Sequence, residues 1–266
     1  MPELPEVETI VRQLRTKVKG KTIVSAEIFD MGVVDPNIKA ILPVKILDVL
    51  RRGKSIIFYL NDGKFILTHL RMTGHFYYVN ILPNEEYRKF MVGKFDFSDG
   101  TFLTHNSIRK FGSMRLVDKD RLKQELDKLG VEPLGAGFTL NRFNEILGKK
   151  ARSNIKTVLL DQSQIAGIGN IYAQEALYFA GINPCRKAGE IQFEEVKKLH
   201  LEVVRILTAA VKQKGSTVDN YSNIDGAGNY QKYLVVYNKQ FCPKKHPLEK
   251  INLGGRGTSF CSVCQR

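Results

Sequence analysis

A β-hairpin is predicted by the stretch Ser55-Ile56-Ile57-Phe58-Tyr59-Leu60-Asn61-Asp62-Gly63-Lys64-Phe65-Ile66-Leu67-Thr68. Two runs rich in β-branched and aromatic residues flank the turn sequence Asn61-Asp62-Gly63, an order that is typical of adjacent antiparallel strands. Residues 94–97 and 101–104 flank Asp99-Gly100 in the same way. Because such hairpins recur between about residues 21 and 117, the sequence predicts a β-sandwich in this part of the chain.

Helical periodicity brackets this strand-rich part. Residues 4–18 predict an amphipathic helix, and Pro2 and Pro5 suit its first turn, where the amide groups lack partners within the helix. Helical periods return between about Arg121 and Gly215, and Gly215 is suited to end a helix. The apolar positions of the opening helix are Val7, Ile10, Val11, Leu14 and Val18. Those of the last helix are Leu199, Val203, Ile206, Leu207, Ala210 and Val211.

The composition is that of an ordinary globular protein with an excess of positive charge. Of the 266 residues, 43% are hydrophobic and 26% charged, which excludes disorder, collagen and coiled coil as descriptions of the whole chain. Lys and Arg number 41 against 27 Asp and Glu, a net charge of +14. Residues 231–266 alone carry seven basic residues and one acidic residue. This excess favours a polyanionic partner such as nucleic acid, although some proteins are basic for other reasons.

Neither membrane insertion nor export is predicted. The chain does not approach the ~20 consecutive apolar residues that span a bilayer, and its acidic start lacks the basic-then-apolar order of a signal peptide. Four cysteines in this length do not form a disulfide scaffold. We therefore expect a soluble protein in a reducing, cytoplasmic compartment.

Cysteine and histidine spacing near the C-terminus predicts a metal site. The pattern is Cys242-x3-His246-x14-Cys261-x2-Cys264. Thiolates and imidazole are the usual ligands of structural zinc, and a short segment with little apolar content needs such a clip to stay folded. We expect one structural Zn²⁺ held by this Cys3His set; the alternative is a group of reduced thiols beside a solvated His246. Cys185 has no partner at metal-ligand spacing and is expected to be a half-buried thiol.

The first residues are a second candidate for chemistry. Removal of Met1 would leave Pro2 with a secondary α-amine, whose ordinary pKa of ~8 gives a useful neutral fraction near pH 7. Such an amine can attack a sugar C1′ and form a cationic iminium. Glu3 is then a candidate acid or base, and Glu6 a candidate to orient the amine. Taken alone, the same residues are also simply a good start for a helix.

Six motifs occur along the chain in a characteristic order. They are Pro2–Thr9, Arg51–Lys54, His69–Gly74, Arg109–Gly112, Ala166–Tyr172 and Gly255–Thr258. Together they resemble the motifs of bacterial formamidopyrimidine-DNA glycosylases, and the resemblance extends from Pro2 to Cys264. The glycines at 167 and 169 do not indicate a dinucleotide site, because Tyr172 stands where a third glycine would be.

The resemblance implies a bifunctional enzyme that removes 8-oxoguanine and ring-opened purines and then cleaves the strand by β,δ-elimination. Pro2 would be the Schiff-base nucleophile and Glu3 the proton donor. Lys54 would donate a proton in β-elimination and contact phosphate. Arg256 would do the same in δ-elimination, and Asn170 would bind the DNA backbone.

The resemblance also implies how the duplex is held once a nucleotide is extruded. Met72, Arg109 and Phe111 would fill the space it leaves, with Arg109 bonding the unpaired base of the other strand. Tyr237 would lie near the phosphate contacts. His69 would either contact the backbone or serve as a structural histidine.

Two features depart from the family pattern. Ser216, Thr217 and Tyr221 match a loop that closes over the extruded base, but Asp219 stands where relatives tend to carry a basic residue. The family usually has four zinc cysteines, and here His246 is the nearest replacement for one of them. The resemblance therefore supports zinc binding with an atypical ligand set.

These observations together predict an α+β multidomain protein. Residues 1–120 would form a catalytic β-sandwich domain with flanking helices, 121–230 a helix-two-turn-helix domain with the lesion-recognition loop, and 231–266 a zinc β-hairpin. The expected partner is double-stranded DNA containing oxidised bases, bound by a monomer associated with the bacterial nucleoid. One alternative is an endonuclease VIII-like glycosylase for oxidised pyrimidines, against which Leu4 argues because that branch typically has glycine there. The other is a catalytically silent binder of damaged DNA.

Overall fold

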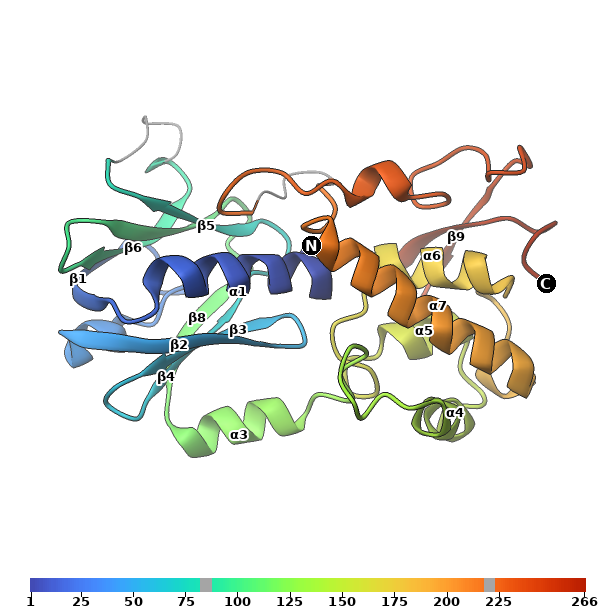
Figure 1. Cartoon of the computed structure of the whole chain (residues 1–266), viewed down its shortest axis with the longest axis horizontal. Helices are drawn as coiled ribbons and strands as arrows, with labels where there is room; N and C mark the ends of the chain where they lie inside the picture. Colours follow the sequence, from blue (N-terminus) through green and yellow to red (C-terminus); the bar gives the residue numbers. More distant parts are fainter. Residues whose placement is uncertain (82–87, 218–222) are drawn as a thin grey trace. The chain divides into compact units, whose positions relative to one another are not determined.

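The chain folds into two compact units. The computed structural model describes residues 1–81, 88–217 and 223–266. The first unit comprises Met1–Asp127 together with Lys214–Asn229, and the second comprises Lys128–Gln213 together with Tyr230–Arg266 (Figure 1). Each unit therefore contains segments that are far apart in the sequence. The helices of the described residues include none that is long and apolar enough to cross a bilayer.

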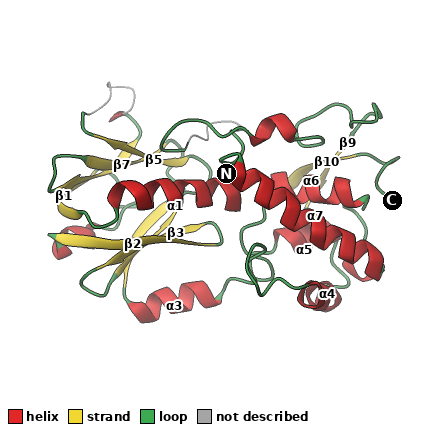
Figure 2. Ribbon diagram, in the orientation of Figure 1, coloured by secondary structure: helices red, strands yellow, loops and turns green. Residues whose placement is uncertain are grey.

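The first unit is built on an antiparallel β-sandwich (Figure 2). Its strands are β1 (Thr22–Ile28), β2 (Val44–Arg52), β3 (Ser55–Leu60), β4 (Phe65–His69), β5 (Gly74–Val79), β6 (Met91–Phe97), β7 (Phe102–Ser107) and β8 (Ser113–Val117). The order β5-β7-β6-β1 continues into β2-β3-β4-β8 through only two pairs, Thr22 with Lys45 and Ile23 with Val44. This narrow junction lets the two halves fold into two layers. Both predicted hairpins are confirmed, since β3 pairs with β4 and β6 with β7.

Helix α1 (Leu4–Val18) forms over the predicted residues and completes the sandwich core. Glu3 is its N-cap and Pro5 lies in its first turn, where a missing N–H costs no helical bond. The predicted apolar face is buried, with no member more than 5% exposed, and it packs into the core cluster that both halves of the sandwich share. Burial of this face fixes the rotation of the helix about its axis. The polar residues of α1 therefore point away from the core, where they can contact other segments of the first unit. The unit also contains the 3-10 helix η1 (Pro36–Ile41) and α3 (Lys119–Asp127).

The second unit is helical, with a small hairpin at its end. Its elements are α4 (Leu140–Lys149), α5 (Ile155–Leu160), α6 (Asn170–Ala180), η2 (Ala188–Glu190), α7 (Phe193–Lys212), η3 (Tyr230–Tyr233), β9 (Glu249–Leu253) and β10 (Arg256–Phe260). Helix α6 packs against α5, α7 and strand β10 and is therefore the centre of this unit. The predicted apolar stripe of α7 is confirmed, with Val211 half-buried and the other members buried.

One core residue of the sandwich makes stability depend on pH. His105 on β7 is fully buried, and neither ring nitrogen has a hydrogen-bond partner among the described residues. Its ring lies beside Phe76, with 4.9 Å between ring centroids. Burial, together with the nearby His75, lowers the pKa of His105 to about 3. Because this pKa lies below the ordinary value of about 6.5, the unfolded chain binds the proton more readily. Stability is therefore complete above pH 6.5 and is lost as the pH falls towards 3.

We expect the shifted pKa of His105 to lower the free energy of unfolding by about 2 kcal/mol when the pH falls from 7.5 to 5. A His105→Leu variant keeps an apolar group against Phe76 and removes the titrating ring, so this part of the pH dependence should disappear. Urea unfolding of both proteins at the two pH values measures the difference. Equal loss of stability in the wild type and the variant would contradict the assignment.

Candidate active site and nucleic-acid interface

The predicted nucleophile, Pro2, and the predicted proton donor, Glu3, are consecutive residues directly before α1. Pro2 is buried, and Glu3 is only 2% exposed. The backbone N–H of Glu3 donates to Glu6 Oε2 at 2.9 Å, which closes a capping box across the first turn. The segment that carries Pro2 is therefore held in one conformation at the positive end of the helix dipole. A secondary amine and a carboxyl group at this place can perform covalent catalysis with proton transfer.

Lys54 lies in the tight turn between β2 and β3 and is 7% exposed. Gly53, beside it, has a φ of +57°, a conformation that favours glycine. Arg51 Nη1 donates to the Gly53 carbonyl at 2.9 Å, and Arg51 Nε donates to Glu8 Oε2 of α1 at 2.9 Å. Helix α1 thus positions the turn of Lys54 as well as the start of the chain.

His69 ends β4, directly opposite Ser55 in the strand register and close to Lys54. Its Nδ1 accepts the backbone N–H of Arg71 at 3.0 Å. Burial, and the charges of Arg71 and Lys54, lower the pKa of His69 to about 4. His69 is therefore neutral at pH 7 and carries its proton on Nε2, which can donate to a phosphate oxygen.

The three residues expected to fill the space of an extruded nucleotide meet at the surface of the first unit. Arg109 Nη1 lies 3.3 Å from Met72 Sδ, and its guanidinium stands 4.9 Å from the ring centroid of Phe111. Met72 is 41% exposed and Phe111 is 59% exposed. The backbone N–H of Arg109 donates to Thr73 Oγ1 at 2.9 Å, which joins the two loops that carry the group. An exposed apolar pair around a guanidinium is suited to replace stacked bases and to bond a base edge.

Ser216 and Thr217 lie in the segment that returns to the first unit. The backbone N–H of Ser216 donates to Glu6 Oε1 at 2.7 Å, so one carboxylate bonds both this segment and the start of α1. Thr217 Oγ1 accepts the backbone N–H of Gly228 at 2.7 Å. Gly215 has a φ of +77°, and a Cβ there would lie 2.7 Å from Glu6 Oε1. Only glycine fits this close approach.

The remaining predictions for this loop concern residues that the structure does not describe. Tyr221 and Asp219 lie in residues 218–222, which are outside the described residues. Their assignment to the lesion-recognition loop therefore stays a prediction.

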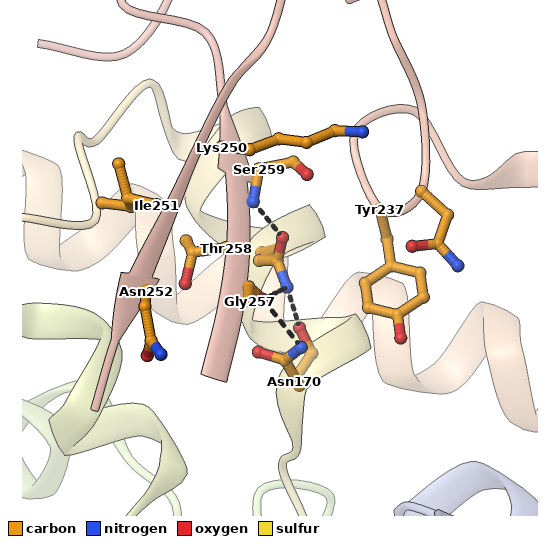
Figure 3. Close-up of a pocket in the computed structure, with 10 residues that line it drawn as sticks. Asn170, Tyr237, Lys250, Ile251, Asn252, Gly257, Thr258 and Ser259 are labelled. Atoms are coloured by element: carbon orange, nitrogen blue, oxygen red, sulfur yellow. Dashed lines mark hydrogen bonds between the residues drawn. The ribbon is translucent and has the colours of Figure 1, made fainter. Parts of the chain in front are cut away.

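The second unit contains a pocket of about 470 Å³ at the start of α6 (Figure 3). Asn170 is the first residue of α6, and its Nδ2 donates to the Gly257 carbonyl of β10 at 3.0 Å. Tyr237 lines the pocket from a separate segment of the chain. Further polar groups come from residues that the sequence did not single out, namely Asn238, Lys250 and Asn252. Amides, a phenol and an ammonium group beside a helix N-terminus are suited to bind a phosphate backbone.

Glu175 orders the segment that carries Tyr237, and sequence reasoning missed it. This residue of α6 is 1% exposed, and its carboxylate accepts three consecutive backbone N–H groups. The distances are 2.9 Å from Val235, 3.0 Å from Val236 and 2.8 Å from Tyr237. Burial raises the pKa of Glu175, and the three N–H donors oppose that shift. The available signal was the single charged residue within a mostly apolar helical run.

Strand β10 is held in place by the same helix. Gln174 is 2% exposed; its Nε2 lies 3.3 Å from the Gly257 carbonyl, and its Oε1 accepts the Ser259 N–H at 2.6 Å. Thr258 Oγ1 donates to the carbonyl of Arg256 at 3.0 Å. Arg256 begins β10 with an exposed side chain, next to the pocket residue Gly257. The predicted contact residues Asn170, Tyr237 and Arg256 are therefore neighbours of one pocket.

The structure brings together the four predicted metal ligands. The Sγ atoms of Cys242, Cys261 and Cys264 and a ring nitrogen of His246 all lie within 4.8 Å of one another. His246 Nδ1 lies 3.6 Å from Cys242 Sγ, 3.6 Å from Cys261 Sγ and 3.3 Å from Cys264 Sγ. A tetrahedral zinc ion with ordinary bond lengths places sulfur and nitrogen ligands about 3.6 Å apart. The four residues therefore fit a zinc ion, with Nδ1 as the histidine ligand.

The surroundings of the cluster shift the pKa values of two of its thiols in opposite directions. Burial raises the pKa of Cys242, but backbone N–H groups of His246 and Lys244 and the side chains of Cys261 and Tyr178 together outweigh it, so the net shift is downward. Burial and the neighbouring Cys261 and Cys242 raise the pKa of Cys264. Cys261 is fully buried. Cys185 lies outside the cluster and is exposed, so the expectation of a half-buried thiol is wrong. It sits in a surface turn in which its N–H donates to Asn183 Oδ1 at 2.9 Å.

Comparisons with known proteins agree with this geometry. Residues 1–114 match the family model of the formamidopyrimidine-DNA glycosylase N-terminal domain, and residues 129–222 match that of the formamidopyrimidine-DNA glycosylase H2TH domain. The formamidopyrimidine-DNA glycosylases of an Exiguobacterium species and of Streptococcus pneumoniae are 39% and 40% identical to the chain, which they cover completely. The chain in turn covers 100% and 99% of these two proteins.

Solved structures show the same likeness. A mutant of the Lactococcus lactis protein, in complex with DNA that contains Fapy-dG, has a TM-score of 0.92 at 34% identity over 100% of both chains. The MutM (Fpg) protein from Thermus thermophilus has a TM-score of 0.89 at 36% identity, covering 99% of this chain and 98% of that one.

A β-sandwich with a proline-glutamate start, an H2TH domain and a small hairpin with a Cys3His cluster define a DNA glycosylase of base excision repair. The chain belongs to the formamidopyrimidine-DNA glycosylase family, in which lyase activity accompanies base removal.

Proposed function

We propose that this enzyme excises oxidised purines, 8-oxoguanine and formamidopyrimidines, from double-stranded DNA and then cleaves the strand by β,δ-elimination. The observation that carries the proposal is the arrangement around α1. That helix starts directly after the buried Pro2–Glu3 pair, and through Glu8 and Arg51 it positions the turn of Lys54. The names of the relatives support the substrate class, as does the Lactococcus lactis complex with Fapy-dG DNA.

The proposed chemistry begins with the amine that removal of Met1 would expose on Pro2. Its nitrogen bonds to C1′ while the bond from C1′ to the damaged base breaks, and the base leaves with a proton. Glu3 donates a proton to the sugar ring oxygen, so the ring opens to a Schiff base. This cation acidifies the C2′ proton; its loss to solvent breaks the C3′–O bond and expels the 3′ phosphate. Loss of the C4′ proton to solvent then breaks the C5′–O bond and expels the 5′ phosphate. Lys54 and then Arg256 supply the protons and the phosphate contacts of the two elimination steps.

The other site residues hold the substrate in this proposal. Met72, Arg109 and Phe111 occupy the space of the extruded nucleotide, because their exposed cluster has the chemistry that this requires. Asn170 and Tyr237 bind the phosphate backbone at the pocket of the second unit, and His69 donates to it through Nε2. Ser216, Thr217 and Tyr221 would take part in recognition of the extruded base.

A zinc ion completes the hairpin in this proposal. Cys242, His246, Cys261 and Cys264 would hold one ion, which clips the segment together and takes no part in the reaction. The enzyme would work as a monomer in the cytoplasm, where it would act on the DNA of the bacterial nucleoid.

Borohydride trapping tests the proposed function. Protein whose Met1 removal has been verified by mass spectrometry is mixed with duplexes that carry 8-oxoguanine opposite cytosine, an oxidised pyrimidine, an abasic site, or no lesion. We expect a covalent complex on the 8-oxoguanine duplex that is lost in Pro2→Gly, because glycine offers a different amine in an unrestricted backbone. A complex formed only on oxidised pyrimidines would favour the endonuclease VIII-like alternative. Absence of a complex on every lesion and on abasic DNA would favour a silent binder.

A further inference from the structure

A side chain in the middle of α1 is joined to the segment that follows residue 222. Gln13 Nε2 donates to Asn223 Oδ1 at 3.0 Å, and Gln13 Oε1 accepts the Ile224 N–H at 3.0 Å. One turn further along the helix, Lys17 forms an ion pair with Asp225 at 2.9 Å. Both groups of the Gln13 amide are therefore used to hold one short piece of chain.

That piece of chain is itself a tight turn. The Asn223 N–H donates to the Gly226 carbonyl at 2.8 Å, and Asn223 Oδ1 also accepts the Asp225 N–H at 3.1 Å. Asn223 is 3% exposed, and Ile224 packs against the apolar core of the sandwich. The turn of residues 223–226 is thus docked on α1 as a unit, with Gln13 at its centre.

The docked turn is connected to Thr217 through Gly228. The Gly228 N–H donates to Thr217 Oγ1 at 2.7 Å. Gly228 also packs so closely on Gly215 that a Cβ at position 228 would lie 2.2 Å from the Gly215 carbonyl oxygen. Gly215 and Ser216 in turn rest on Glu6 of α1. A continuous set of contacts therefore runs from Gln13 through the turn and Gly228 to Thr217.

We propose that Gln13 is a positioning residue for base recognition: it fixes Thr217 for contact with the extruded base and does not act in strand cleavage. This inference rests on the proposed function, in which Ser216 and Thr217 take part in recognition of the damaged base. At an abasic site there is no base for Thr217 to contact, so cleavage there depends on Pro2 and Lys54, which the Glu6 and Glu8 contacts hold independently of Gln13.

The test compares two reactions of the full-length enzyme on one duplex sequence. Single-turnover rates are measured for excision of 8-oxoguanine and for cleavage at a preformed abasic site. We expect Gln13→Ala to slow excision about 10- to 100-fold and to leave abasic cleavage within about twofold of the wild type. Gln13→Glu keeps an acceptor for the Ile224 N–H but loses the donor to Asn223. Its excision rate should therefore lie between the rates of the wild type and of Gln13→Ala.

Thr16→Ala is the matched control on the same helix. Thr16 is exposed, and its hydroxyl donates only to the Arg12 carbonyl of α1, at 3.0 Å, among the hydrogen bonds of the described residues. Both of its rates should equal those of the wild type. If the rates of excision and of abasic cleavage fell equally in the Gln13 variants, Gln13 would only support the structure in general. If the excision rate did not change, Gln13 would not position Thr217. Either result overturns the inference. A wild-type enzyme that cleaves abasic DNA but does not excise 8-oxoguanine would instead contradict the proposed substrate.

Discussion

Replacing Glu175 by Gln should lower the affinity for a duplex with a stable abasic-site analogue about 10- to 100-fold. The carboxylate accepts three backbone N–H groups, and a carboxamide of the same shape places an N–H donor against at least one of them. A buried hydrogen bond to a charged group is worth about 1.5–3 kcal/mol, and its loss leaves an unpaired donor. The segment of Tyr237 would then lose its fixed position beside Asn170, so binding energy must be spent on ordering it.

A double-mutant cycle separates this effect from general destabilisation. If Glu175 acts through Tyr237, Glu175→Gln should cost much less affinity in a Tyr237→Ala background than in the wild type. Glu145→Gln on α4 is the matched control, because it removes the same charge from an exposed residue of the same unit. Loss of a negative charge should by itself favour DNA, so the expected fall cannot be a charge effect. Fluorescence anisotropy supplies the four dissociation constants, and strictly additive losses would refute the positioning role of Glu175.

Features with a local signature were accessible from the sequence. Two runs of β-branched and aromatic residues around Asn61-Asp62-Gly63 define a hairpin that needs no distant partner, and the structure confirms it as β3 and β4. The spacing of Cys261 and Cys264 is equally local, and it led to the cluster that the structure contains. The hairpin is encoded within a few residues, and the metal site by two short spacings, Cys242-x3-His246 and Cys261-x2-Cys264, that lie close together in the sequence.

Features made by distant contacts were not accessible in this way. Gln13 bonds Asn223 across 210 positions of the chain, and Glu175 bonds a segment about 60 residues later. No periodicity connects such positions, because their partners are chosen by the packing of whole elements. Met72, Arg109 and Phe111 were found through resemblance to a family, and only the structure shows that they touch. Positioning residues are therefore the part of the site that a single sequence hides.

Metal removal should unfold the β9–β10 hairpin while the sandwich stays folded. Strand β9 has no buried residue, so only β10 is anchored on α6, and a two-stranded pair is marginal in water without further support. Zinc bound to a site of this type contributes about 10–16 kcal/mol to folding of the segment that carries it. Without zinc, Arg256 loses the strand that presents it, so we expect the affinity for DNA to fall at least about 100-fold.

Hydrogen exchange and metal analysis of variants test this expectation together. A Cys261→Ser, Cys264→Ser double variant should contain no zinc and lose amide protection in residues 241–264, with protection of β1–β8 unchanged. His246→Cys should keep one zinc per chain because thiolate can replace imidazole at a tetrahedral site, whereas His246→Ala should bind it weakly. Cys185→Ser is the control, since this exposed cysteine lies outside the cluster. One equivalent of zinc in the double variant, or an unaltered exchange pattern after chelation, would show that the fold of the hairpin does not depend on these ligands.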